Sequence, residues 1–179
     1  MKKNFDRSEP AILKALESLS VVSEIKDLRH LFKGIKPRFA IDQSNPVVNE
    51  FFSRIDKMVL CTSDLALYPN ERQYEDERST AIKVLIDLSE NTQDFKLYLY
   101  FTNMLYDLHM TMKNKVEAAE LMMLVASKMS FKDATIYPSC FGIHQMSARH
   151  QKKHLYRNAA DLFFEAQFYE RSMDALKEL

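Results

Sequence analysis

Cysteine and histidine side chains gather in one part of the chain with spacing that resembles a set of metal ligands. Cys140, His144, His150 and His154 follow one another within fifteen residues. On a helix, His150 and His154 would share one face, as paired zinc ligands do. However, the chain has no Cys-x-x-Cys pair, and Cys140 and His144 lie in an irregular stretch. We therefore interpret the histidines as solvated side chains near a basic helix start and predict no metal site.

Nucleophilic catalysis and phosphate binding are the other chemistries that single residues could support. Cys61 falls inside a helical pattern of apolar residues, where a small buried side chain is the simplest interpretation. A cysteine nucleophile also needs a base and an oxyanion site, and the sequence supplies neither. The two glycines, Gly34 and Gly142, are too far apart for a Gly-rich phosphate loop. The sequence thus predicts no catalytic residue and no cofactor.

Composition and charge narrow the class of protein. The chain has 179 residues, of which 46% are hydrophobic, enough for one core; two small lobes are the alternative. Its 25 basic and 25 acidic residues cancel, so nothing suggests nucleic acid as a partner, and near-zero charge favours association. No apolar run approaches the roughly 20 residues of a membrane span. Two cysteines form no disulfide framework and no secretory signal is present, so we expect a cytoplasmic protein.

The stretch 95–129 is the element around which the rest of the chain is arranged. Its first half carries one apolar helical stripe formed by Leu97, Phe101, Met104, Leu105, Leu108 and Met112. Lys113, Asn114 and Lys115 interrupt the pattern and suit a tight turn. A second helix follows from about Val116, and its alanines would let a neighbouring helix come close. The stretch therefore predicts an antiparallel helical hairpin.

Helical patterns also flank this central hairpin. Segment 1–44 reads as an N-terminal helical segment that ends in a connector, and Asn45-Pro46 opens a helix that fades at about residue 68. A further helix follows an acidic run, residues 131–149 form an irregular loop, and a last hairpin starts near residue 150. We predict an all-α fold, an antiparallel array of tetratricopeptide-like helix pairs, with segment 1–44 beside a lobe over residues 45–179.

The two hairpins resemble each other in sequence. Val116-Glu117-x-Ala119 in the first corresponds to Tyr169-Glu170-x-Ser172 in the second. In tetratricopeptide-like hairpins the small residue of such a pattern lies where two helices touch. Ala119 and Ser172 are therefore predicted to lie at helix–helix contacts.

The long helix carries a second apolar strip, Leu99, Tyr106 and Met110, on the side opposite its main stripe. One interpretation is that another helix of the same chain covers this strip. The other is that the strip is exposed and meets a partner, which would be a second copy if the chain dimerises. The sequence leaves both open.

From about residue 51 onward the order of segments resembles the first helical lobe of the catalytic region of the dedicator-of-cytokinesis (DOCK) family. Four segments carry the resemblance: Glu77 to Leu85, Tyr98 to His109 with its Asp107-Leu108-His109, Glu117-Ala118-Ala119, and His154-Leu155-Tyr156 through Tyr169-Glu170 to Lys177-Glu178-Leu179. The resemblance as a whole extends over about two-thirds of the chain. Tyr169 stands where the family usually has tryptophan, and segments 1–50 and 131–149 have no counterpart.

The resemblance implies a function for the chain. DOCK proteins are guanine-nucleotide exchange factors for Rac- and Cdc42-type Rho GTPases, and their first lobe mediates homodimerisation and packs against the following lobes. Those following lobes hold the GTPase, so the chain is expected to be a dimerisation and scaffold module without exchange activity of its own. The alternative is a tetratricopeptide-like protein-interaction module unrelated to GTPase exchange. A small helical enzyme is a further alternative that no residue supports.

Overall fold

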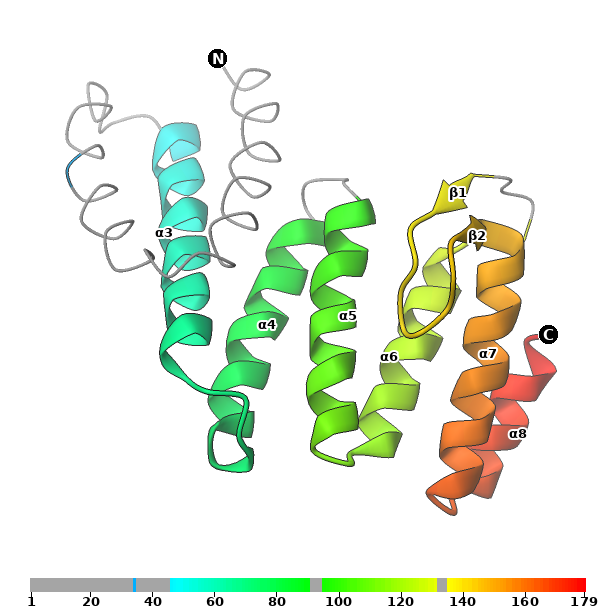
Figure 1. Ribbon diagram of the computed structural model, residues 1–179. Helices are drawn as coiled ribbons and strands as arrows, with labels where there is room; N and C mark the ends of the chain where they lie inside the picture. The colour runs from blue at the N-terminus through cyan, green and yellow to red at the C-terminus, as the bar shows by residue number, and fades with distance from the viewer. Residues whose placement is uncertain (1–33, 35–45, 91–94, 132–134) are drawn as a thin grey trace. The chain divides into compact units, whose positions relative to one another are not determined.

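The structure is a computed structural model that describes residues 34, 46–90, 95–131 and 135–179 (Figure 1). Its elements in order are α3 (Pro46–Leu67), η2 (Arg72–Tyr74), α4 (Glu75–Glu90), α5 (Phe95–Thr111), α6 (Lys115–Lys128), β1 (Ile136–Tyr137), β2 (Met146–Ser147), α7 (Ala148–Glu165) and α8 (Tyr169–Lys177). Six α-helices thus account for most of the described residues, which confirms the predicted helical fold. The helices predicted within segment 1–44 lie outside the described part of the chain.

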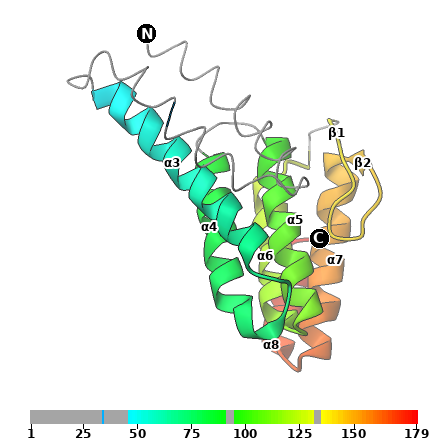
Figure 2. The same cartoon turned by 60° about the vertical axis from the view of Figure 1, so that its left-hand side comes forward.

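The chain divides into two compact units, residues 1–98 and 99–179, with the division inside α5. In the first unit α3 and α4 form an antiparallel pair (Figures 1 and 2). Both helices bury apolar side chains at helical spacing: Ile55, Met58 and Val59 from α3, and Ile82, Leu85 and Ile86 from α4. The predicted boundary near residue 44 stays a prediction, because residues 1–33 and 35–45 lie outside the described part of the chain.

An arginine joins the ends of this pair. The Nη1 atom of Arg78, on α4, donates to the carbonyl oxygens of Leu65 (3.0 Å) and Tyr68, at the C-terminal end of α3. The last carbonyls of a helix have no partner within the helix, so a guanidinium that satisfies two of them stabilises the helix end. Three acidic residues lie in the first turn of α4: Glu75, Asp76 and Glu77. Their negative charges interact favourably with the positive N-terminal end of the helix dipole.

In the second unit α6 packs on α7, and α7 packs on α8. The core of this unit is built from small and large residues that fit together, all almost fully buried: Ala118, Ala119, Met122, Val125 and Ala126 on α6, and Leu155, Ala159, Ala160 and Phe163 on α7. Within this unit α7 therefore pairs with the helix before it and the helix after it, as expected of an array of helical hairpins.

The two helical hairpins of this unit turn in the same way, 54 residues apart. At the first turn Asn114 N–H donates to the His109 carbonyl and Lys113 adopts φ 65°; at the second, Phe168 N–H donates to the Phe163 carbonyl and Gln167 adopts φ 66°. This left-handed residue with a bond back across the turn is a Schellman cap. The constant spacing makes Ala118, not Ala119, the counterpart of Ser172. The sequence comparison of the two hairpins was therefore wrong by one residue.

Segment 131–149, expected to be irregular, contains a small hairpin that lies against α7. Ile136 pairs with Ser147 and Tyr137 with Met146, and a tight turn joins Cys140 to Ile143 by two backbone hydrogen bonds of 3.1 and 2.8 Å. The two central residues of the turn, Phe141 (φ 52°) and Gly142 (φ 72°), are both left-handed. Glycine adopts this conformation freely, whereas phenylalanine does so at a cost.

Candidate interaction surface

Ala119 and Ser172 both lie in the packed interior of the second unit. Ala119 is 0% exposed on α6. Ser172, on α8, is also buried, and its Oγ donates a hydrogen bond of 2.8 Å to the Ala160 carbonyl of α7. A short polar side chain therefore brings α8 close to α7 without leaving its hydroxyl unsatisfied.

Charged side chains connect α6 to its two neighbours. At one end of the α6–α7 pair Lys115 contacts Glu165 (2.8 Å), and at the other end Lys152 donates to the Met129 carbonyl (2.8 Å). On α8, both Nε and Nη2 of Arg171 bond to Glu120 of α6 at 2.6–2.9 Å. Although exposed pairs contribute little individually, a two-atom arginine clamp fixes geometry. Positions along three helices are thus fixed relative to one another.

The predicted strip on α5 is only partly accessible. Leu99 is buried, Tyr106 is half-buried, and Met110 is exposed. The ring of Tyr106 meets the ring of Phe141 edge to face, with centroids 5.0 Å apart. A segment of the same unit therefore covers part of the strip, which is one of the two interpretations that the sequence left open. Self-association through Leu99, Tyr106 and Met110 stays a prediction.

The tip of the β1–β2 hairpin is a packing centre that sequence reasoning missed. Phe141 is 2% exposed, and its backbone N–H donates to Oδ1 of Asn103 on α5 (2.5 Å). On the other side Gln151 of α7, itself buried, donates from Nε2 to the Pro138 carbonyl and to Sγ of Cys140, both at 3.0 Å. Gly142 after a large aromatic residue was the available signal, since it marks a tight turn. The hairpin is therefore held from both sides.

The cysteines and histidines show no sign of reaction chemistry. Burial raises the pKa of the Cys140 thiol to about 12, partly offset by the hydrogen bond from Gln151, and burial also raises the pKa of Cys61. A thiol that stays protonated is a poor nucleophile. His150 Nδ1 contacts Ser147 Oγ at 2.8 Å. Across residues 46–90, 95–131 and 135–179, no three histidine, cysteine or acidic side chains come together as a metal site.

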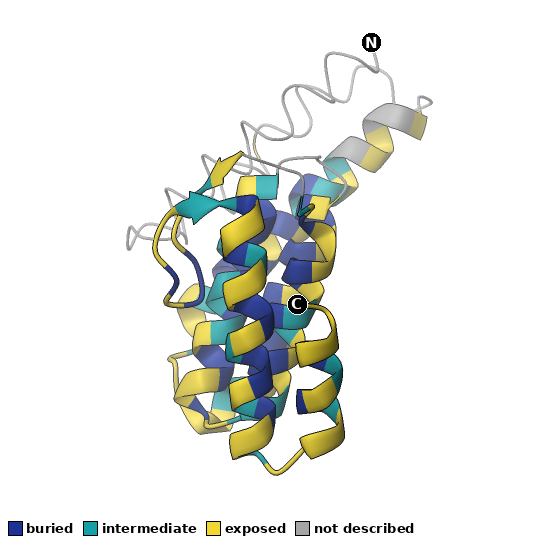
Figure 3. Cartoon of the chain, turned by 90° about the vertical axis from the view of Figure 1, so that its right-hand side faces the viewer, coloured by how far each residue is buried: buried dark blue, intermediate teal, exposed yellow. Residues whose placement is uncertain are grey.

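The most apolar surface of the second unit lies on its last hairpin. Phe164 at the end of α7 and Tyr169, Met173 and Leu176 on α8 are 63, 55, 57 and 46% exposed, and we call them the α8 patch. Tyr169, Met173 and Leu176 recur at helical spacing, and the ring of Tyr169 meets that of Phe164 at 5.3 Å. Figure 3 shows buried residues on the inner side of α7 and α8 and exposed ones outside. Contiguous exposed apolar residues mark a contact surface.

Comparisons with protein-family models, curated proteins and solved structures find no match to this chain. No described helix is both long and apolar enough to cross a bilayer. Function must therefore be argued from the residues and their geometry.

Proposed function

We propose that the chain is a dimerisation and scaffold lobe of a DOCK-type guanine-nucleotide exchange factor for Rho-family GTPases. In this role it binds a second copy of itself and supports the following lobes of the parent protein, which contact the GTPase. It needs no metal or cofactor, and it performs no exchange by itself.

The observation that supports this proposal is where the segments that resemble the family fall. Glu77 to Leu85 lies within α4, Tyr98 to His109 within α5, Glu117 to Ala119 at the start of α6, and the last segment spans α7 and α8. Their apolar and small residues, including Leu108, Ala119 and Leu155, are buried. The segments therefore lie on helices and include residues that pack those helices together, alongside exposed residues such as His154, Tyr169 and Lys177.

A tetratricopeptide-like interaction module is the second candidate. The α8 patch favours it, because an exposed apolar strip on an outer helix is what such a module offers to a partner. This candidate predicts binding without any relation to nucleotide exchange.

A nucleotide-release assay separates the two candidates. Rac- and Cdc42-type GTPases loaded with fluorescent nucleotide are mixed with the 179-residue chain or with the product of its complete native reading frame. We expect release at the intrinsic rate with the chain alone and acceleration with the full product. Release above the intrinsic rate with the chain alone, or no acceleration by the full product, would overturn the proposal.

A further inference from the structure

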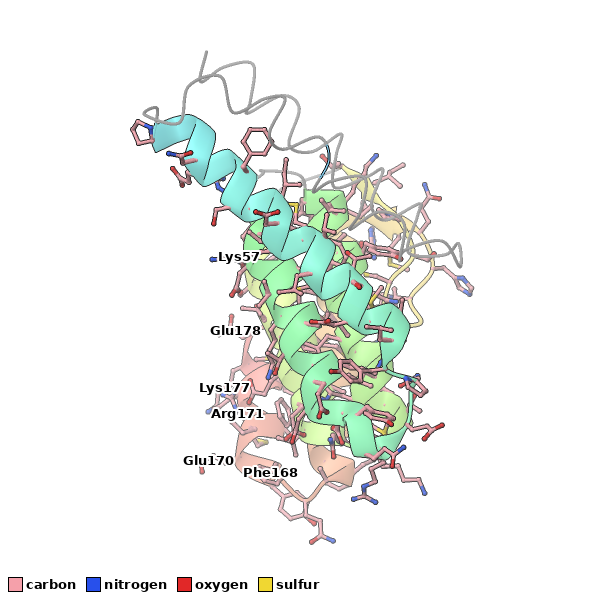
Figure 4. All side chains as sticks on the ribbon, turned by 90° about the vertical axis from the view of Figure 1, so that its left-hand side faces the viewer. Lys57, Phe168, Glu170, Arg171, Lys177 and Glu178 are labelled. Carbon is pink, nitrogen blue, oxygen red and sulfur yellow. The ribbon has the colours of Figure 1, made fainter. Side chains whose placement is uncertain are left out.

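The exposed side of α8 combines an apolar stripe with a charged border, and both features run along the same short helix. Tyr169, Met173 and Leu176 form the stripe, while Glu170 and Lys177 lie beside it, about 100° and 80° round the helix from Tyr169 at 100° per residue. Figure 4 shows Glu170 and Lys177 along the same outer edge of α8. The hydrogen bond with Asp174, and then the charges of Asp174 and Glu170, raise the pKa of Lys177.

The order of charges along the border is self-complementary. Glu170 and Lys177 are seven residues apart, roughly 10 Å along a helix. When two identical helices pack antiparallel about a two-fold axis, the same border of each helix faces the other. An axis beside Met173 and Asp174 then brings Glu170 of one copy opposite Lys177 of the other, twice. In a parallel two-fold arrangement the two borders would instead lie on opposite sides of the contact, so Glu170 and Lys177 would not meet across it.

The apolar stripe fits the same arrangement. The axis brings the two Met173 side chains together at the centre and puts Tyr169 of each copy near Leu176 of the other. Methionine at the centre suits such a contact, because its flexible side chain fills irregular gaps. Tyrosine is favoured in buried interface centres.

The other charges of α8 do not oppose this pairing. Arg171 is already bonded to Glu120 on the side turned toward α6. Asp174 contacts Lys177 of its own helix at 2.9 Å, further round from the stripe. Arg171 therefore leaves the stripe free, and Lys177 would share or exchange its exposed contact with Asp174 when it meets Glu170 of another copy.

The available area matches a weak, specific dimer. Phe168 and Leu179 flank the α8 patch, and together with its four residues they make six large apolar side chains that are 43–63% exposed. At about 200 Å² for each side chain, this leaves on the order of 600 Å² per copy. A pair would bury on the order of 1,200 Å², the lower end of the range for specific interfaces.

We propose that two copies of this chain associate through the α8 patch, with α8 antiparallel to α8 and Glu170 of each copy paired with Lys177 of the other. The inference rests on the proposed function only in expecting self-association. It assigns that association to the last hairpin and not to the strip on α5.

Charge reversal tests the pairing by sedimentation equilibrium of the full 179-residue chain. Glu170→Lys and Lys177→Glu each leave like charges opposed in their own homodimer, so each should weaken association about tenfold. The double variant restores opposite charges and should recover wild-type association. An equimolar mixture of the two single variants should also recover it, because the heterodimer pairs opposite charges at both positions. Lys83→Glu, an exposed reversal on α4, should leave association unchanged.

A second variant tests the stripe. Met173→Glu should abolish association up to about 100 µM with unchanged helical dichroism. Leu60→Glu, at an exposed apolar residue of α3, should not. A wild-type chain that stays monomeric at these concentrations would overturn the proposal and leave the patch to another segment of a longer product or to a different protein. If the Met173→Glu variant still associates, the interface is not the α8 patch. If a mixture of the two charge-reversal variants associates no more strongly than either variant alone, the antiparallel pairing is wrong. None of these results depends on nucleotide exchange. Loss of the α8 dimer can therefore be distinguished from loss of the proposed exchange-factor function.

Discussion

The Oγ of Ser172 on α8 donates a 2.8 Å hydrogen bond to the carbonyl of Ala160 on α7. Both residues are almost fully buried. A serine hydroxyl can approach a neighbouring helix backbone as closely as this because it is small and finds its acceptor there. The bond is thus the polar part of an otherwise apolar contact between the last two helices.

Removing this hydroxyl should destabilise the second unit. We expect Ser172→Ala to lower the free energy of unfolding by about 1 kcal/mol, the usual net contribution of a buried hydrogen bond. Ser127→Ala is the matched control, since Ser127 bonds only within its own helix and is exposed. It should change stability by less than about 0.5 kcal/mol. Urea unfolding measures the free energy of unfolding of both variants. Equal losses would show that the Ser172–Ala160 hydrogen bond adds no more stability than a bond within one exposed helix.

Enlarging Ala119 should overpack the buried face of α6. We expect Ala119→Leu to cost about 1–3 kcal/mol, because the side chain is 0% exposed and its neighbours cannot move apart freely. Ala66→Leu, at an exposed position of α3, should be nearly neutral. Chemical denaturation decides: a cost below about 0.5 kcal/mol for Ala119→Leu would place that residue outside the tight contact.

Tyr106 distinguishes the two interpretations of the α5 strip. Because its ring contacts Phe141, Tyr106→Glu should lower the melting temperature without changing the molecular mass in solution. Met110→Glu, on the same strip but exposed, should change neither quantity. If both variants instead lower the mass while the helical dichroism is kept, the strip is a partner surface, as the sequence also allowed.

Arg78 should stabilise the C-terminal end of α3. Arg78→Met removes the donor that serves the carbonyls of Leu65 and Tyr68, and we expect a loss of about 1.5–3 kcal/mol for this charged hydrogen-bond pair. Lys83→Met, which removes an exposed charge from the same helix, serves as the control. Faster amide exchange at the last turn of α3 in the arginine variant alone would locate the effect.

Cys140 should contribute to the dependence of stability on pH at the alkaline end. Burial raises the pKa of its thiol to about 12 from an ordinary value of 9.0, so the folded chain holds this proton more tightly than the unfolded chain. The contribution is complete below pH 9 and is lost as pH rises toward about 12. Urea stability of the wild type should therefore fall more steeply across this window than that of Cys140→Ala. Parallel slopes would contradict the buried, protonated thiol.

The helical part of the fold could be predicted because its signals are periodic. The stripe from Leu97 to Met112 and the proline and asparagine breaks gave α3 to α8 to within a few residues. The repeated pattern around Ala119 and Ser172 suggested helix–helix contacts, but it could not align the two hairpins, since only the Schellman turns fix which residues correspond. The β1–β2 hairpin was missed because two-residue strands show no periodicity. Its contacts with Asn103 and Gln151 join residues far apart in sequence, which no local pattern reports.

The short length of α8 has a consequence for the patch it carries. Nine residues are too few for a stable isolated helix in water. The helix therefore depends on docking, chiefly through Ser172 on α7 and Arg171 on Glu120 of α6. Local unfolding of α8 would disrupt most of the α8 patch while the rest of the unit stays folded. Any partner that covers the patch must in turn hold α8 in place, so occupancy and local order are thermodynamically linked and each strengthens the other.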